Sequence, residues 1–182
     1  MDLKRLIRNW HIKAGGEDYF SKFTFEYLAF IAYIKNNKYP EINRDRSVIQ
    51  KLKQCSILRD EYFQLVQTKQ ELRKSWEQIK NEFDREPFHD VASTNINLPE
   101  YAYWNCSHDN YSQKTEEDLA KPNGVIHSLD DWENMIEFWY CVRNNLFHGA
   151  KDPEHKRDQF AVEYAYKTLR ELVDLFLQEQ ES

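Results

Sequence analysis

An arginine and a histidine five residues apart mark the stretch of this chain best suited to acid–base chemistry on a phosphate. They are Arg143 and His148, in the string 143–149, which reads RNNLFHG. Histidine gives or takes a proton near neutral pH. Arginine is a permanent cation whose forked N–H groups match phosphate oxygens. Asn144 and Asn145, beside the arginine, can add hydrogen bonds or orient the pair.

RNA is a substrate that suits these groups, because its phosphodiester carries its own nucleophile, the 2′-OH. Cleavage needs a proton acceptor, a proton donor and positive charge near the phosphorus. We expect neither a metal nor a cofactor, because no carboxylate cluster that would hold two divalent ions is visible in the sequence. One chain offers a single histidine in this string, so we expect two copies to face each other across a two-fold axis.

The string ends an amphipathic helix that we expect over residues 129–148, with Ser128 as its N-cap. Successive residues turn by about 100°, which places Trp132, Ile136, Trp139 and Arg143 on one face. Because that face is otherwise apolar, Arg143 should be buried with a partner or point into a site. Gly149 suits the left-handed position that ends a helix, and His148 lies at the negative end of the helix dipole, which favours its charged form.

Helical periodicity recurs along the rest of the chain. We expect helices at 2–14 and 17–35, the second being apolar almost all round and so the most buried. Two or three short helices should fill 45–83, with breaks near 55–56 and 68, and a last helix should span 156–179. The prediction is an all-α, up-and-down helical bundle, with its two long C-terminal helices packed antiparallel.

Residues 84–127 differ from this pattern, and we expect them to form a long irregular insertion within a single domain of residues 1–182. Asn, Ser, Asp and Pro are frequent in the insertion. Its aromatic residues Tyr101, Tyr103 and Trp104 are candidates for stacking on RNA bases. Cys106 and His108 are too few to predict a zinc site.

Composition limits the class of protein. The net charge of −6 argues against generic nucleic-acid binding, but it is unevenly spread, at +5 over residues 1–82, −5 over 83–128 and −6 over 129–182. Contacts with a polyanion should therefore use the first part of the chain and Arg143. Three scattered cysteines favour a reducing compartment, and neither a signal peptide nor a membrane span is apparent. We expect a cytoplasmic location.

The string RNNLFHG follows an aromatic-rich helix, and after it come Lys151-Asp152-Pro153 and Arg157-Asp158 at the start of the last helix. This arrangement resembles the HEPN superfamily, the higher eukaryote and prokaryote nucleotide-binding domains. The family signature is an arginine, a polar residue, a short spacer and a histidine. The resemblance is specific over about residues 128–177 and only architectural over 1–83.

The resemblance implies a homodimer whose two signatures line one cleft. Many members are metal-independent endoribonucleases of toxin–antitoxin and antiphage-defence systems, and they are thought to leave a 2′,3′-cyclic phosphate. Carried over to this chain, His148 is the general base or acid, Arg143 the phosphate clamp and Asn144 the polar assistant. Some families also use an acidic residue on an earlier helix, for which Glu26 is a possible equivalent.

Two other interpretations stay open. In the first, the chain is a non-catalytic module that binds RNA, a nucleotide or an antitoxin protein. In the second, it is a structural helical protein in which Arg143 belongs to a core ion pair. Single histidines in polar surroundings are expected at the surface, and they are His11, His89, His127 and His155.

Overall fold

The computed structural model describes residues 3–16, 18–88, 124–149 and 151–179. Within these ranges the regular elements are all helices and no strand occurs, which confirms the all-α bundle. The helices are α1 (Leu3–Ala14), α2 (Tyr19–Tyr33), the single π-helical stretch η1 (Ile34–Lys38), α3 (Asp45–Lys53), α4 (Ser56–Thr68), α5 (Gln70–Arg85), α7 (Trp132–Phe147) and α8 (Lys156–Glu179).

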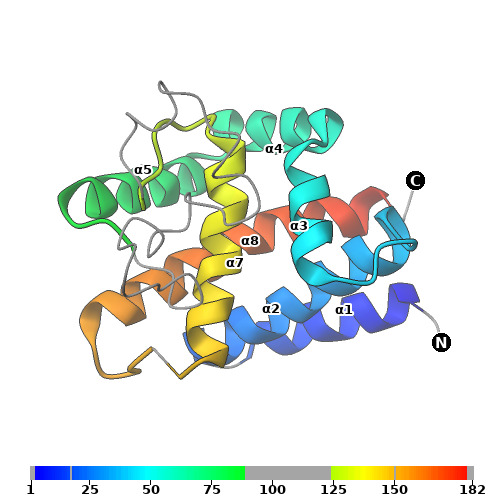
Figure 1. Cartoon of the computed structure of the whole chain (residues 1–182), viewed down its shortest axis with the longest axis horizontal. Coiled ribbons are helices and arrows are strands. Elements are labelled where there is room, and N and C mark those ends of the chain that lie inside the picture. The colour runs from blue at the N-terminus through cyan, green and yellow to red at the C-terminus, as the bar shows by residue number, and fades with distance from the viewer. Residues whose placement is uncertain (1–2, 17, 89–123, 150, 180–182) are drawn as a thin grey trace, which may run out of the picture.

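The helices form two crossed groups (Figure 1). α1, α2 and α8 run along one another, and α3 and α7 stand side by side across them. The two C-terminal helices differ here from the antiparallel pair expected from the sequence. α7 crosses α8 steeply in Figure 1, and α8 packs mainly along α2. This arrangement leaves one long side of α7 beside α3, which matters for the candidate site.

α7, rather than α2, is the most buried helix, whereas α2 packs along both α1 and α8. Trp139 of α7 is fully buried and contacts the rings of Tyr62 and Trp76, each with a centroid separation of 5.7 Å. Its indole N–H donates to the Thr168 hydroxyl at 2.9 Å. In α2, by contrast, some aromatic side chains, Phe25 among them, lie only partly within the core.

Several predicted boundaries are confirmed. The breaks near 55–56 and 68 separate α3, α4 and α5, and the last helix spans the predicted residues. α7 begins at Trp132, later than expected, because Ser128 does not cap it. The Ser128 hydroxyl bonds Asp130 instead. The Asp131 carboxylate accepts the backbone N–H of His127 at 2.8 Å and the Asn134 amide at 2.7 Å.

The two ends of the irregular insertion are held together. The backbone N–H of Phe88 donates to the carbonyl of Gly124 at 2.8 Å, and the side chains of Phe88, Val125 and Ile126 are buried. Residues 89–123 lie outside the described part of the chain. The predictions for His89, Tyr101, Tyr103, Trp104, Cys106 and His108 fall on these residues. None of the described helices is long and apolar enough to cross a membrane.

Candidate active site

Arg143 stands where the apolar face of α7 reaches the surface. Trp132, Ile136 and Trp139 precede it on that face and are at most 3% exposed, whereas the Arg143 side chain is 28% exposed. Its carboxylate neighbour is Asp45 of α3, and the Arg143 Nη2 to Asp45 Oδ2 distance of 4.0 Å is long for an ion pair. Asp45 bonds Lys35 more closely, at 2.8 Å. Arg143 therefore keeps N–H groups that an incoming anion can use.

Asn144 orients this guanidinium. Its Oδ1 accepts a hydrogen bond from Arg143 Nη1 at 3.0 Å, and the residue is 5% exposed. The Asn144 side chain also hydrogen bonds to Tyr140. Asn145 has a different place, since it is 1% exposed and its amide donates to Cys141 Sγ at 3.7 Å. Asn144 thus adjoins the site, whereas Asn145 belongs to the interior of the helix packing.

His148 is exposed at the end of α7. Its backbone N–H donates to the carbonyl of Asn144 at 2.9 Å, and Gly149 follows with a φ of +67°, the left-handed conformation expected for this glycine. Among the described residues the imidazole has neither a hydrogen-bond partner nor a carboxylate within ion-pair distance. The imidazole is therefore open to solvent and to a substrate.

Arg143 and His148 do not touch through their side chains in the described structure. Five residues along a helix correspond to a rotation of about 140° between their positions. One chain consequently offers a guanidinium and an imidazole from different sides of one helix end. Both groups reach a single phosphate only if the substrate wraps around the helix end or a second chain supplies one of them.

The neighbouring helix α3 contributes charged groups that the sequence pattern did not identify. Glu137 of α7 is 2% exposed and forms ion pairs with Arg46, at 2.7 Å, and with Lys53. Burial alone would raise the pKa of Glu137, but the charges of Lys53 and Arg46 outweigh it and lower the pKa. Arg46 also lies over the ring of Tyr140, with 5.2 Å between its guanidinium carbon and the ring centroid. The basic character of residues 1–82 was the only sequence signal for this contact.

A buried hydroxyl lies behind Arg143. Tyr27 of α2 is 3% exposed, and its hydroxyl has no hydrogen-bond partner among the described residues. Burial raises the pKa of Tyr27, and Arg143 acts against that shift through its charge. Tyr27 therefore stays a neutral hydrogen-bond donor at physiological pH. In the sequence it is one aromatic residue among many on α2, and nothing in its spacing distinguished it.

Glu26 belongs to a different part of the molecule. Its Oε1 lies 2.7 Å from His11 Nδ1, and the other nitrogen of that ring lies 3.1 Å from Asp174 of α8. The sequence-based expectation that His11 is at the surface is wrong, because His11 is 8% exposed. Two carboxylates from other helices make this burial favourable for a charged imidazole. Glu26 therefore forms an ion pair with His11 where α1, α2 and α8 meet.

The segment after the string RNNLFHG is tied back to α8. Lys151 and Asp158 form an ion pair at 2.5 Å, and Asp158 also accepts the backbone N–H of Asp152 at 3.1 Å. Arg157 pairs with Glu86 and donates to the carbonyl of Pro87 at 3.1 Å. Lys151 and Arg157 are thus engaged within the chain and support the helix end rather than a substrate. His127 and His155 are likewise paired with the carboxylates of Asp131 and Asp158.

Within the described ranges no group of three or more His, Cys, Asp or Glu side chains is placed to hold a metal ion. Comparison of the chain with protein-family models, with curated proteins and with solved structures gives no match.

Proposed function

We propose that this chain is a metal-independent endoribonuclease that cleaves single-stranded RNA by transesterification and acts as a homodimer. The observation that carries the proposal is the group at the end of α7. A partly exposed Arg143, oriented by Asn144 at 3.0 Å, lies within two helical turns of an exposed His148 that bonds no described side chain. The family resemblance of RNNLFHG supports the same assignment.

The chemistry uses few groups. One His148 accepts the proton of the 2′-OH, whose oxygen attacks the adjacent phosphorus. Arg143 donates hydrogen bonds to the phosphate oxygens as negative charge builds up on them. The bond from phosphorus to the 5′-oxygen breaks, and this oxygen takes a proton from a second histidine. The products are a 2′,3′-cyclic phosphate and a 5′-hydroxyl.

The second histidine comes from the partner chain in this proposal. A single imidazole that has just accepted a proton could return it to the leaving oxygen only after crossing the phosphate. Two His148 side chains facing each other remove this requirement, and a two-fold axis supplies them. The family resemblance indicates a toxin or antiphage-defence system as the setting of such a homodimer. An antitoxin protein would then be its inhibitor.

Purified protein should cleave single-stranded RNA in the presence of EDTA, and His148→Ala should abolish cleavage while the helical circular dichroism stays unchanged. The expected loss is at least 10²-fold, the usual contribution of a proton-transfer group. The same sequence with 2′-O-methyl riboses should resist cleavage, because the nucleophile is blocked. Mass spectrometry should find fragment ends one water lighter than a linear phosphate.

His155→Ala is the matched control, because His155 is an exposed histidine of the same chain. Its cleavage rate should equal that of the unmodified protein. Cleavage that survives His148→Ala, or that continues on 2′-O-methyl RNA, would contradict the proposed function.

A non-catalytic RNA- or antitoxin-binding module is the second candidate. It is favoured by the approximately 140° between the positions of Arg143 and His148 around the helix, which separates the two groups within one chain. Under this alternative RNA binds without being cut, and binding weakens as salt is added.

A further inference from the structure

Most of α7 is buried, but one strip of it faces solvent. This strip holds the partly or fully exposed residues Glu133, Tyr140, Arg143 and Phe147, whose positions fall within about 80° of rotation around the helix, while Ile136 in the same arc is buried. The adjacent α3 lies along the same side and places Arg46 over Tyr140. Arg143 lies over Phe147 in the same manner, with 4.7 Å between the guanidinium carbon and the ring centroid. Aromatic rings and cations therefore alternate along the strip.

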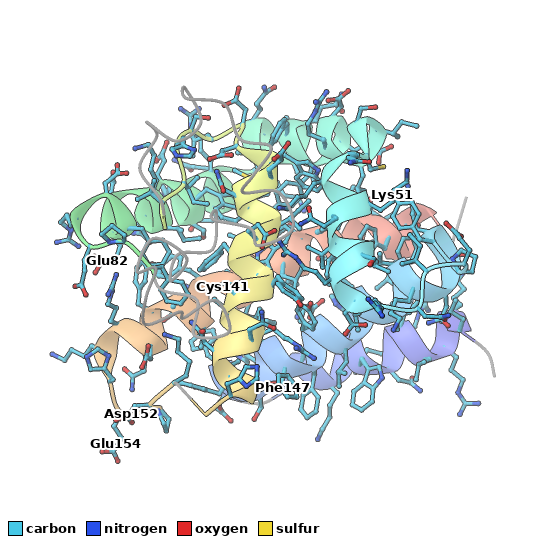
Figure 2. All side chains as sticks on the ribbon, in the orientation of Figure 1. Lys51, Glu82, Cys141, Phe147, Asp152 and Glu154 are labelled. Carbon is cyan, nitrogen blue, oxygen red and sulfur yellow. The ribbon has the colours of Figure 1, made fainter. Side chains whose placement is uncertain are left out.

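Phe147 is the most unusual member of the strip. It is 60% exposed, and only Ile12 and Ile57 share such exposure among the large hydrophobic side chains of the described residues. Those two are aliphatic and lie on α1 and α4. Figure 2 shows Phe147 at the end of α7, on the outside of the molecule. An exposed phenyl ring thus sits beside the two residues proposed to act on a phosphate, His148 following it directly.

We propose that Phe147 stacks on a nucleobase of the RNA whose phosphate Arg143 binds. This inference rests on the proposed function and names a substrate contact of the same site. Arg143 covers one face of the ring, and a base can stack on the other. Residues four apart on a helix, such as Arg143 and Phe147, are neighbours on its surface. The base and the phosphate of one nucleotide are similarly close, so one nucleotide can contact both side chains. Stacking on an aromatic ring tolerates any base, because every base has a π-face.

The charge arrangement favours RNA as the occupant. Arg46 is held by Glu137, and Lys35 by Asp45, so neither is a spare cation. Arg143, at 4.0 Å from Asp45, is the cation of the strip with the weakest internal pairing. Phe147 and Arg143 together offer one apolar face and one anion-binding group, the two needs of a single nucleotide. A purely apolar protein partner would leave the guanidinium without its counter-charge.

The test compares two ligands on the His148→Ala protein and on variants of it with a second substitution. The His148→Ala protein binds without cutting, and its affinity is measured for a fluorescent single-stranded oligoadenylate and for an abasic oligonucleotide of equal length. In this protein, Phe147→Ala should weaken oligoadenylate binding roughly 5- to 150-fold, the range for losing one stacked base. Binding of the abasic ligand, which keeps its phosphates, should not change. Phe147→Tyr should restore binding of the oligoadenylate.

Ile57→Ala is the matched control, since Ile57 is as exposed as Phe147 and should leave both affinities unchanged. Equal losses on the two ligands would overturn the inference, and so would no loss or no binding at all. Light scattering on each variant tests the alternative that the Phe147 ring belongs to a dimer interface. In that case Phe147→Ala would lower the measured molecular mass. The two proposals can fail separately. If cleavage depends on His148 while Phe147→Ala weakens binding of neither ligand selectively, the proposed function stands and only the stacking contact is excluded.

Discussion

At the scale of single residues, burial decides which titratable groups serve the fold and which are available for chemistry. His11 and His148 are both histidines near a helix end, yet His11 is 8% exposed between two carboxylates and His148 is exposed with no described partner. Burial by itself lowers the pKa of His11, but hydrogen bonds to Asp174 and Glu26, together with their charges, raise it to about 9. His11 is thus positively charged at neutral pH and stabilises the contact of three helices.

The pH dependence of stability follows from this shift. The pKa of His11 is about 9 in the folded protein and 6.5 for an unperturbed histidine. The stabilisation is therefore complete below about pH 6.5 and is lost as pH rises to about 9, by up to about 3 kcal/mol. Urea unfolding at pH 6.5 and pH 9 should show this decrease. In His11→Gln most of the decrease should vanish, and an unchanged pH dependence in that variant would contradict the assignment.

His155→Gln is the control for this measurement. His155 is 61% exposed, so its removal should leave the pH dependence as it is. Glu26 contributes in the same direction but at lower pH, because its pKa is also raised in the folded protein. Burial raises the pKa of Glu26, while His11 and the charge of Arg170 act against that shift.

At the scale of elements, the contact between α3 and α7 determines where the candidate site lies. Glu137 draws Arg46 and Lys53 onto α7, and Asp45 at the start of α3 lies beside Arg143. The residue pair Arg46 and Glu137 is 91 positions apart in the sequence. A short basic helix is thereby fixed beside the signature, and its cations are used mainly for internal pairing.

Removing the central carboxylate should loosen this contact. Glu137→Gln leaves Arg46 and Lys53 without their buried counter-charge, and losing one member of a buried pair typically costs about 3 kcal/mol or more. Chemical denaturation should show a loss of this size. Glu133→Gln, one turn earlier on the exposed strip of α7, should change the unfolding free energy by less than about 0.5 kcal/mol. Similar losses in both variants would mean that the pairing is not what stabilises the contact.

At the scale of the whole molecule, the distribution of charge and the single histidine proposed to be catalytic both bear on assembly. Residues 129–182 carry a net charge of −6 and residues 1–82 a net charge of +5. The acidic residues of 129–182 would repel the proposed RNA substrate, so we expect it to approach Arg143 from the side of α3. Each chain supplies one His148, and the proposed reaction uses two.

A dilution experiment tests whether two chains share one site. Unmodified protein and His148→Ala protein are mixed in different ratios, unfolded and refolded together. If one site needs both histidines, an equal mixture keeps about one quarter of the activity, since about a quarter of random dimers have two unmodified chains. Light scattering should give twice the chain mass of 22.1 kDa. Activity that falls in proportion to the unmodified fraction would indicate that each chain acts alone.

The sequence alone determined the helices, their breaks and the local order of the signature. These properties depend on neighbours within a few residues, such as the apolar period of α8, the break between α4 and α5, and Gly149 after His148. It also identified Arg143 as a residue that breaks an apolar face. The sequence predicts that α7 begins at residue 129, whereas it begins at Trp132. The reason is that the Ser128 hydroxyl bonds Asp130 and the Asp131 carboxylate bonds the backbone of His127, so Ser128 does not cap the helix.

Only the tertiary structure decided which distant side chains meet. The approach of Arg46 to Glu137 and of His11 to Asp174 depends on how whole helices cross, and no periodicity within a helix encodes that. The same reason explains why Tyr27, Asp45 and Tyr140 were missed beside Arg143. Whether a side chain is covered is a property of its neighbours in space, so the exposure of Phe147 and the burial of His11 became visible only once the helices were packed.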